Sequence, residues 1–504
     1  MADAVFVDAG ALLADAVGAR HVLRGPAIAE EYGGDESLAV ARRAPAYVVR
    51  PASAADVADV LRVAGERRIP VTARGAGTGM SGACVPAPGG IVVSFERMNR
   101  VLEVDAVNHV AVVQPGVSLE ALDRATASAG LCYPVRLGEP SASVGGTIAT
   151  NAGGTHAVRH GITRHHVLGL EAVLASGAIV RSGGKYVKTS AGYDLTQLLV
   201  GSEGTLALVT EATLRLRPRA GRSATVLTAF GSEEDVFRAV PPLAGGSSGP
   251  HGGPGPGGGP GPGGRPGPGG GSESGGCPEP VALEYVDLLA MAAIAADGPE
   301  GAAGLGGPED VRLAALGYLL VVLEDRSASR LEEDVETVAG RLLELGALDV
   351  SVLPAGAARK LAEARERAFW TAKAAGADDV VDAVVPRGAL PVLPAAARAA
   401  AEDTGSLVTG CGHAGDGNVH LSVFQPDPVR RDEVLRRLFR AAGEHGGAVS
   451  GEHGVGRAKK PYFLELEDPA KVELMRGIRL ASDPHGILNP GVLLGSGRSP
   501  QGRK

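Results

Sequence analysis

The sequence is poor in cysteine and in aromatic residues, and it carries no excess of positive charge. Its 504 residues include four cysteines, with no Cys-x-x-Cys pair, which argues against a zinc ribbon or an iron–sulfur cluster. Aromatic residues make up 3% of the chain, and the formal net charge is −8. Basic surfaces and stacking platforms are what nucleic-acid binding uses, so this composition argues against that class of protein.

Long apolar runs are also missing. No window of about 18 residues is both apolar and uncharged, so we expect no membrane span. Asp3, Asp8 and Asp15 interrupt the apolar residues of the N-terminus, and no basic segment precedes them, which is unlike a signal peptide. The low cysteine content fits a reducing compartment. We therefore expect a cytoplasmic protein, and peripheral attachment at the inner face of the membrane stays open.

The length predicts two or three domains. A helical arm is expected over residues 1–44. Alternating strands such as "AYVVRP" and helices such as "SAADVADVLRVAGERR" predict an α/β or α+β domain over 45–220. A second α+β domain is expected over 221–482, followed by a segment at 483–495 and a tail at 496–504.

Residues 245–276 consist almost entirely of glycine, proline and serine. Such a composition cannot bury apolar area, so it predicts a disordered segment. The glycines lack the strict three-residue period of a collagen helix over enough length. Sequence typical of ordered structure resumes at "PVALEYVDLLAMAAI", so we interpret the segment as a loop inserted in the second domain.

The stretch "ARGAGTGMSG" at 73–82 follows a predicted strand and matches G-x-G-x-x-G. Pro86 and Pro88 disfavour a helix directly after it, so a helix N-terminus cannot face a phosphate as in the dinucleotide-binding fold. The loop would then bind phosphate through backbone N–H groups, and a plain glycine-rich turn is the alternative. Further glycine clusters at 139–167 and 200–216 favour an extended ligand lying against the backbone.

The order of "RGAGTGMSG", "SVGGTIATNAGG" and "GYDLTQLLVGSEGTLALVTEATL" resembles the FAD-binding domain of the vanillyl-alcohol oxidase type. The second half, ending in "DPHGILNPG", resembles the matching C-terminal FAD-oxidase domain. The resemblance covers residues 40–495 apart from the insertion, and it is greatest to the D-2-hydroxyacid dehydrogenase group, with D-lactate dehydrogenases and the D subunit of glycolate oxidase. It implies an α+β fold in which a two-part FAD-binding domain is joined to an α+β substrate-cap domain.

The resemblance also implies which residues contact FAD. The pyrophosphate would lie near Arg74, Gly75, Ala76, Gly77, Thr78, Gly79, Ser81 and Gly82. The adenine and isoalloxazine rings would contact Pro140, Gly145, Gly146, Asn151, Gly153, Gly154, Gly161, Glu203 and Gly204. Asn489 would approach the flavin from the C-terminal segment. Some relatives bind flavin covalently through a histidine of the first glycine loop, and since this loop has none, we expect non-covalent FAD.

The stretches "GCGHAGDGNVHLSVF" and "SGEHGVG" carry His413, His420, Glu452 and His453. Two histidines and a glutamate are a ligand set of catalytic zinc, and manganese or iron is compatible with it. His453 would remain free as a general base, since an imidazole with a pKa near ~6.5 suits proton abstraction at neutral pH. Each histidine alone could instead cap or pack a strand. Both stretches together favour the metal site, and the resemblance implies the same roles.

A substrate carboxylate is best clamped by an arginine, whose fork matches two oxygens. The resemblance places Arg365 in this role, with Arg367 as the competitor two residues on. Relatives that oxidise hydroxy-dicarboxylates carry a lysine at the position of Val380 and an asparagine at that of Ser422. The loss of a cation and an amide favours a small monocarboxylate, D-lactate or glycolate.

The combined interpretation is an FAD-dependent dehydrogenase that oxidises a small D-2-hydroxy acid to the 2-oxo acid. Metal-assisted proton abstraction would accompany hydride transfer to flavin N5. A cytochrome, a quinone, an electron-transfer flavoprotein or oxygen could accept the electrons, and a homodimer is compatible with the sequence. The alternatives are the flavin subunit of a glycolate oxidase with an iron–sulfur partner subunit, a non-redox transferase on the same fold, and a non-catalytic flavin-binding protein.

Overall fold

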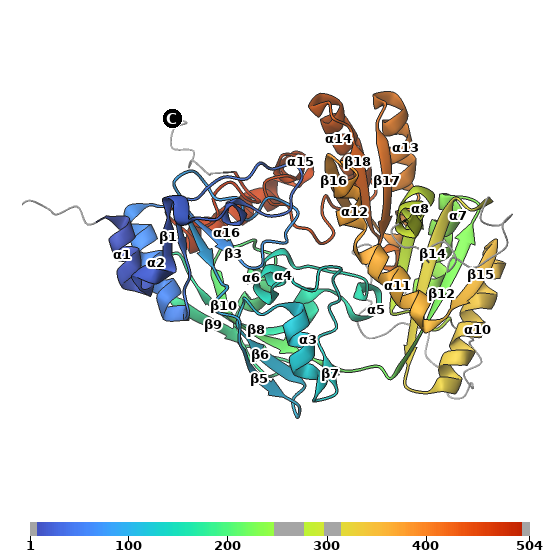
Figure 1. Cartoon of the computed structure of the whole chain (residues 1–504), viewed down its shortest axis with the longest axis horizontal. Coiled ribbons are helices and arrows are strands. Elements are labelled where there is room, and N and C mark those ends of the chain that lie inside the picture. Colours follow the sequence, from blue (N-terminus) through green and yellow to red (C-terminus); the bar gives the residue numbers. More distant parts are fainter. Residues whose placement is uncertain (1–7, 246–276, 297–313, 496–504) are drawn as a thin grey trace, which may run out of the picture.

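The computed structural model describes residues 8–245, 277–296 and 314–495. Figure 1 shows two bodies side by side, joined by the chain that runs from the first body into β12 (Arg222–Phe230). The predicted insertion at 245–276, Gly245 apart, and the tail at 496–504 lie outside the described residues. Among the helices that are described, none combines the length and apolarity that crossing a membrane requires.

The first body begins with a four-stranded sheet. Its strands follow the order β1 (Val22–Arg24), β2 (Tyr47–Val49), β4 (Ile91–Ser94) and β3 (Val71–Arg74). The last three are parallel, and β1 pairs antiparallel with β2. Helix α2 (Ala54–Arg67) connects β2 to β3, and the Ser53 side chain caps it by accepting a hydrogen bond from the Asp56 backbone N–H, as its sequence predicts.

Residues 1–44 differ from the predicted helical arm. Only α1 (Ala9–Val17) is an α-helix, and the rest of the described segment contains β1 and short 3-10 helices. Gly18, at a φ of 87°, ends α1, and Gly25 and Pro26 follow β1 directly. These residues interrupt a helix, and the short apolar strand between them pairs with β2 instead. The segment is therefore part of the first sheet.

A five-stranded antiparallel sheet completes the first body. Its order is β5 (Val101–Asp105), β6 (Val110–Val113), β10 (Leu208–Arg215), β8 (Val167–Val173) and β9 (Ile179–Gly183). Fully and partly buried residues alternate along β10, as expected for a strand with one face on the core. Three helices add apolar side chains to that core, namely α3 (Leu119–Ala127), α4 (Val144–Thr150) and α6 (Leu195–Leu199).

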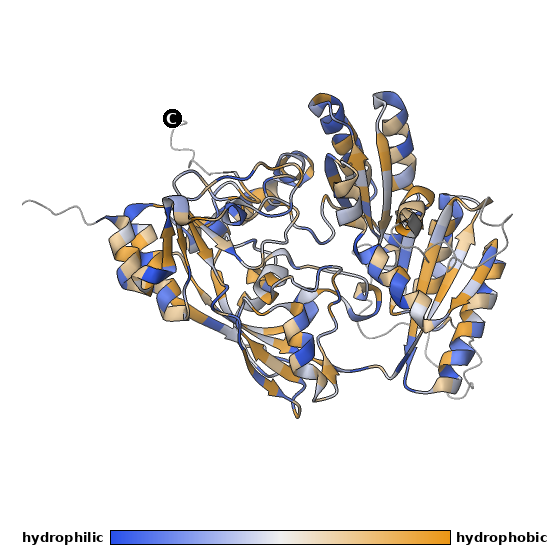
Figure 2. Cartoon of the chain, in the orientation of Figure 1, coloured by the Kyte–Doolittle hydropathy of each residue, from blue (hydrophilic) through white to orange (hydrophobic). Residues whose placement is uncertain are grey.

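The second body is built on a seven-stranded antiparallel sheet. Its order is β15 (Asp349–Leu353), β12, β14 (Gly317–Asp325), β13 (Ala282–Asp287), β17 (Leu407–Gly412), β18 (Asn418–Phe424) and β16 (Asp379–Val384). Val226 and Leu227 of β12 belong to separate apolar clusters, because successive side chains of a strand point to opposite faces. Both faces of the sheet therefore carry apolar side chains. Its strands are mainly hydrophobic in Figure 2.

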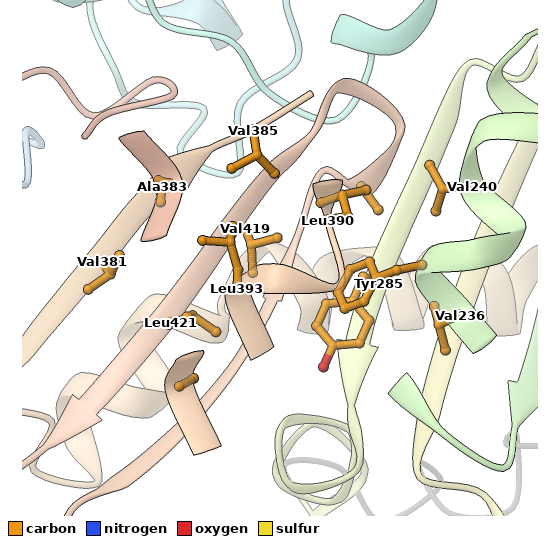
Figure 3. Close-up of a cluster of buried hydrophobic side chains, with 14 of the residues drawn as sticks. Val236, Val240, Tyr285, Val381, Ala383, Val385, Leu390, Leu393, Val419 and Leu421 are labelled. Atoms are coloured by element: carbon orange, nitrogen blue, oxygen red, sulfur yellow. The ribbon is translucent and has the colours of Figure 1, made fainter. Parts of the chain in front are cut away.

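Helices cover the two faces of this sheet. The larger cluster receives side chains from α7 (Glu233–Ala244), α10 (Ala328–Glu344), α13 (Val392–Thr404) and α14 (Pro428–Glu444). The smaller cluster receives them from α8 (Leu288–Ala296) and α11 (Ala355–Glu366). Figure 3 shows the larger cluster, where Val419 and Leu421 of β18 lie among side chains from β16 and α13. This packing gives the hairpin of β17 and β18 a fixed place.

The chain returns to the first body after α14. Helix α15 (Lys460–Leu466) still adds Tyr462 and Phe463 to the core of the second body. Helix α16 (Pro469–Ser482) adds Val472 to the same core, whereas its Ile478 packs against the core of the five-stranded sheet. Val71 of β3 then exchanges backbone hydrogen bonds with the segment at 487–489. The C-terminal part of the chain therefore links both bodies, and α15 and α16 lie beside the first body in Figure 1.

Candidate active site

A cavity of about 240 Å³ lies between the two bodies. Most of the residues predicted to contact FAD line it, namely Gly75, Ala76, Gly77, Thr78, Gly79, Ser81, Gly145, Gly146, Gly154, Glu203, Gly204 and Asn489. The predicted metal ligands His413, His420 and Glu452 line it too, as do His453 and Arg365. The structure therefore brings the two predicted sites into one cavity, although they are far apart in the chain.

Six of the predicted FAD contacts do not line the cavity: Arg74, Gly82, Pro140, Asn151, Gly153 and Gly161. Arg74 donates a hydrogen bond to the Gly34 carbonyl, and Asn151 ends α4 in a left-handed conformation. Gly153 lies beside the candidate metal site, where an added Cβ would be 3.3 Å from Glu452 Oε2. Arg74, Asn151 and Gly153 therefore lie behind the residues that line the cavity.

The glycines of these loops allow the cavity wall to pack closely against neighbouring segments. A Cβ on Gly75 would lie 2.0 Å from Ser143 Oγ, and one on Gly145 would lie 2.6 Å from Pro115 Cβ. Gly77 has a φ of 79°, which side-chain-bearing residues rarely adopt. The buried hydroxyl of Ser81 has no hydrogen-bond partner among the described residues. A narrow wall of backbone with an unpaired donor fits the pyrophosphate and flat rings of FAD.

The hairpin of β17 and β18 supplies the two histidines. His413 follows β17, and His420 lies on β18, where its backbone pairs with Cys411. Glu452 comes from the loop after α14, and its Oε1 lies 3.1 Å from His413 Nε2 and 3.2 Å from His420 Nε2. One ligand atom from each of the three residues lies within 4.8 Å of the others. This donor set fits one divalent cation, and Glu452 Oε2 is buried without a hydrogen-bond partner in the described part of the chain.

A buried glutamate on β13, Glu284, contacts both His413 and Arg365. Its Oε1 lies 2.8 Å from His413 Nδ1, and its Oε2 lies 2.7 Å from Arg365 Nη2. Burial acts to raise the pKa of Glu284, but His413 and Arg365 outweigh it and hold that pKa below its usual value. A carboxylate on the outer nitrogen of a histidine fixes the ring orientation of a metal ligand.

Arg365 is buried, with 6% of the residue exposed, and its guanidinium is only partly satisfied. Its approach to Glu284 is close but not aligned as a hydrogen bond, so Nε and Nη2 lack an acceptor among the described residues. Unpaired buried donors are unfavourable unless a ligand meets them. Arg365 thus offers free N–H groups beside the cavity.

Asp382 of β16 organises the loop that carries Glu452. The residue is fully buried, and its Oδ2 accepts hydrogen bonds from the backbone N–H groups of 451–453 at 2.9–3.2 Å. Ser450 Oγ and Lys459 Nζ also donate to this oxygen, at 2.8 and 2.9 Å. Burial opposes ionisation, but Lys459 and the nearby histidines hold the pKa of Asp382 well below its usual value. The loop is therefore anchored by a charged group.

Asp382, His420 and His453 form a second group in which ligand atoms lie close together. Its carboxylate is already occupied by Lys459, Ser450 and backbone donors, as described above, whereas Glu452 keeps an unpaired oxygen. The set of His413, His420 and Glu452 is consequently the better cation site.

The predicted base, His453, lies next to this site. Its ring centroid is 4.8 Å from that of His420, and its Nδ1 is 3.8 Å from Asp382 Oδ2. Burial lowers the pKa of His453 to about 4, because the opposing effect of Asp382 is smaller and His420 and Lys459 also lower it. The imidazole is therefore neutral at neutral pH and has a lone pair that can accept a proton, but this pKa lies below the value near ~6.5 on which the prediction of a general base rested.

Glu203 and Asn489 join the FAD side of the cavity to the histidine side. The Glu203 carboxylate accepts hydrogen bonds from the backbone N–H groups of Val455 and Gly456, at 2.9 and 2.8 Å. Burial raises the pKa of Glu203 to about 7. Asn489 Nδ2 donates to the carbonyls of Glu203 and Ala83, at 2.9 and 3.1 Å. Both residues therefore anchor the walls of the cavity as well as line it.

Glu284, Asp382 and Lys459 have no role predicted from the sequence. One signal was available for Asp382, which stands in the apolar strand "DVVDAV", where a charged residue is rarely buried without a partner. Its partners could not be identified in this way, since Lys459 lies 77 residues further along the chain.

Comparison with known proteins agrees with this geometry. A family model of the FAD binding domain matches residues 45–183, and one of the C-terminal domain of FAD linked oxidases matches residues 277–493. The chain is 50% identical over 486 residues to an uncharacterized FAD-linked oxidoreductase of Mycobacterium tuberculosis, covering 96% of this chain and 98% of that protein. The chain belongs to the FAD-linked oxidoreductase family.

Two further comparisons concern activity and fold. A D-lactate dehydrogenase of Archaeoglobus fulgidus is 36% identical to the present chain over 449 residues. The match covers 89% of this chain and 91% of the dehydrogenase. The solved structure of 4-ethylphenol oxidase from Gulosibacter chungangensis, at 19% identity, aligns with a TM-score of 0.71 over 97% of each chain and shows the fold alone. The predicted two-domain FAD-binding fold of the vanillyl-alcohol oxidase type is confirmed.

We expect Asp382→Asn to destabilise the protein by about 3–5 kcal/mol, because it leaves the Lys459 ammonium buried without a counter-charge. The double variant Asp382→Asn/Lys459→Met should recover part of this loss, since it removes both charges. The measurement is the free energy of unfolding from urea titrations. As the control, Asp432→Asn removes a half-exposed partner of Arg436 and should change stability by less than about 1 kcal/mol. Equal effects of Asp382→Asn and Asp432→Asn would contradict the anchoring role.

Proposed function

We propose that this FAD-linked oxidoreductase oxidises a small D-2-hydroxy acid, D-lactate or glycolate, to the 2-oxo acid. The observation that carries the proposal is the convergence of His413, His420, Glu452 and His453 in the cavity lined by the glycine loops. When bound, FAD supplies an acceptor for two electrons, and a divalent cation, zinc or else manganese or iron, supplies Lewis acidity. FAD is expected to bind without a covalent bond, since residues 73–82 contain no histidine.

Arg365 is proposed to bind the substrate carboxylate. It lines the cavity with unpaired N–H groups, whereas its competitor Arg367 is exposed and does not line the cavity. The neighbouring Glu284 neutralises part of the positive charge, so a carboxylate would bind mainly through directed hydrogen bonds to the guanidinium. This arrangement suits one carboxylate held in one orientation.

His453 is proposed to take the proton of the substrate hydroxyl. Its neutral ring lies beside the candidate ligands, and the Asp382 carboxylate, 3.8 Å from Nδ1, can stabilise the imidazolium that forms. His413, His420 and Glu452 would hold the cation that orients the hydroxyl. Glu284 and Asp382 hold these side chains in place from behind.

The pairing of β16 with β18 supports a small substrate. Val380 and Ser422 are direct partners across the two strands, next to the pair formed by Asp382 and His420. Side chains two residues apart on a strand share one face, so positions 380 and 422 lie on the same face as Asp382 and His420, although neither position lines the cavity. Neither carries a charge that could bind a second carboxylate. The similarity to a D-lactate dehydrogenase over most of the chain agrees with this assignment.

The visible spectrum of the purified, anaerobic protein tests the proposal. We expect flavin absorption that bleaches when D-lactate or glycolate is added, and no bleaching after prior treatment with a chelator. L-lactate and D-2-hydroxyglutarate serve as controls for stereochemistry and size. Flavin bands that none of these acids bleaches would contradict the dehydrogenase proposal and favour a transferase or a non-catalytic flavoprotein.

We expect His453→Ala to slow flavin reduction by the substrate about 10²–10⁴-fold while FAD stays bound, because a positioned base is lost. Stopped-flow absorbance measures the reduction rate, and the flavin spectrum reports occupancy. His445→Ala, a change at the exposed end of α14, is the control and should leave the rate unchanged. Wild-type reduction by His453→Ala would rule out the base.

Arg365→Lys should raise the KM for the hydroxy acid about tenfold or more, because a lysine cannot present two parallel N–H groups to a carboxylate. Arg367→Lys, two residues away on the exposed side, should leave KM unchanged. Steady-state kinetics with an artificial electron acceptor gives both values. The opposite pattern would assign the clamp to Arg367.

A further inference from the structure

A second cavity, of about 530 Å³, lies where the two bodies meet. On the first body it is bordered by α5 (Ala157–His160) and by the paired strands β7 (Leu131–Cys132) and β11 (Arg217–Pro218). On the second body it is bordered by the end of β14 and the residue that follows, Arg326. It shares no lining residue with the cavity of the candidate active site. It is therefore a separate space.

Basic side chains dominate the walls of this cavity. Three carboxylates line it (Asp123, Glu324 and Asp325), against five arginines (Arg136, Arg159, Arg217, Arg219 and Arg326). This excess of positive charge stands in a chain whose formal net charge is −8. Like charges placed together in a concave site repel one another and focus the potential inside it, so the site attracts anions.

Two of the arginines are engaged within the protein. Arg219 Nη2 lies 2.6 Å from Asp123 Oδ1, and Arg159 Nη1 donates to the backbone carbonyl of Glu324 at 3.3 Å. Arg159 Nε also lies 4.0 Å from the Glu279 carboxylate. Burial raises the pKa of Glu324, and Arg159 and Arg136 oppose this shift. The carboxylates of the cavity therefore compensate only part of its positive charge.

The other three arginines, Arg136, Arg217 and Arg326, form no ion pair with any residue that the structure describes. The Nε of Arg217 is buried and has no hydrogen-bond partner among those residues. The Nδ1 of His160, another lining residue, is also buried and unpaired. Buried polar atoms in native proteins usually have hydrogen-bond partners, so these two atoms are available to a bound ligand.

We propose that this cavity binds a small polyanion that carries phosphate or carboxylate groups. Guanidinium forks match both kinds of oxyanion, and several of them converging on one cavity favour a ligand with more than one charged group. The volume lies within the usual range for small-molecule sites and exceeds what a single oxyanion needs. Arg326 belongs to one body and Arg136 and Arg217 to the other, so the ligand would bridge the two.

The position of α5 places this polyanion close to the candidate active site. His156, Arg159 and His160 line the second cavity, whereas Val158 packs against the turn at 414–416 that follows His413. A Cβ on Gly415 of that turn would lie 2.8 Å from Val158 Cγ2, so the contact is tight. The polyanion site thus lies one short helix away from a proposed metal ligand.

Calorimetric titration of the FAD-loaded, full-length protein tests the proposal, with inorganic pyrophosphate and citrate as probes. We expect saturable binding of at least one probe, which weakens as salt is added. The double variant Arg136→Gln/Arg217→Gln should weaken this binding about tenfold or more, because it removes two charged donors. Arg326→Gln should also weaken it from the other body. Arg440→Gln, which changes an exposed arginine of α14, is the matched control and should leave the Kd unchanged.

The comparison of probes identifies the ligand class. Tighter binding of pyrophosphate assigns a phosphate-bearing ligand, and tighter binding of citrate assigns a polycarboxylate. Absence of saturable binding of both probes would overturn the proposal. Binding that persists in Arg136→Gln/Arg217→Gln but is lost in Arg365→Lys would also overturn it, since the probe would then occupy the candidate active site. Because Arg136 and Arg326 are exposed, the single variants Arg136→Gln and Arg326→Gln serve if the double variant does not fold.

Discussion

The candidate active site depends on the buried carboxylate of Asp382. Three consecutive backbone N–H groups, a serine hydroxyl and the Lys459 ammonium all donate to one of its oxygens. A carboxylate without exposed surface is tolerated only when its charge is met in this way. These hydrogen bonds fix the backbone conformation of the loop at 450–453. This conformation places Glu452 and His453 next to His413 and His420.

The two sides of the main cavity differ in the chemical groups that form them. The FAD side is made of backbone, because side chains at positions such as Gly75 and Gly145 would collide with neighbouring segments. The other side is made of ionisable side chains held by buried polar groups, as Glu284 orients His413 and the Asn418 amide oxygen contacts His420. The Glu203 carboxylate joins the two sides through the N–H groups of Val455 and Gly456. The interface between the two bodies is therefore also the site.

Charge is distributed unevenly over this acidic chain. Near the main cavity two buried cations lie against buried acids, Lys459 against Asp382 and Arg365 against Glu284, and Arg365 keeps N–H groups without an acceptor among the described residues. The second cavity leaves Arg136, Arg217 and Arg326 without such partners among the described residues. A paired interior charge fixes geometry, whereas an unpaired one in a concave space creates affinity for a ligand of the opposite sign. The two cavities show these two uses of charge.

The sequence by itself determined the fold family, and most of the site residues predicted from it line the main cavity. Glycine loops and the spacing of His413 and His420 on one hairpin are local features, and their backbone requirements can be read from a short stretch. Only the tertiary structure decided that residues 22–24 join the first sheet and that residues 19–44 do not extend a helix. It also decided the partners of Asp382 and Glu284 and the gathering of arginines in the second cavity. These contacts join segments far apart in the chain, and local sequence carries no record of which distant side chain will meet a buried charge.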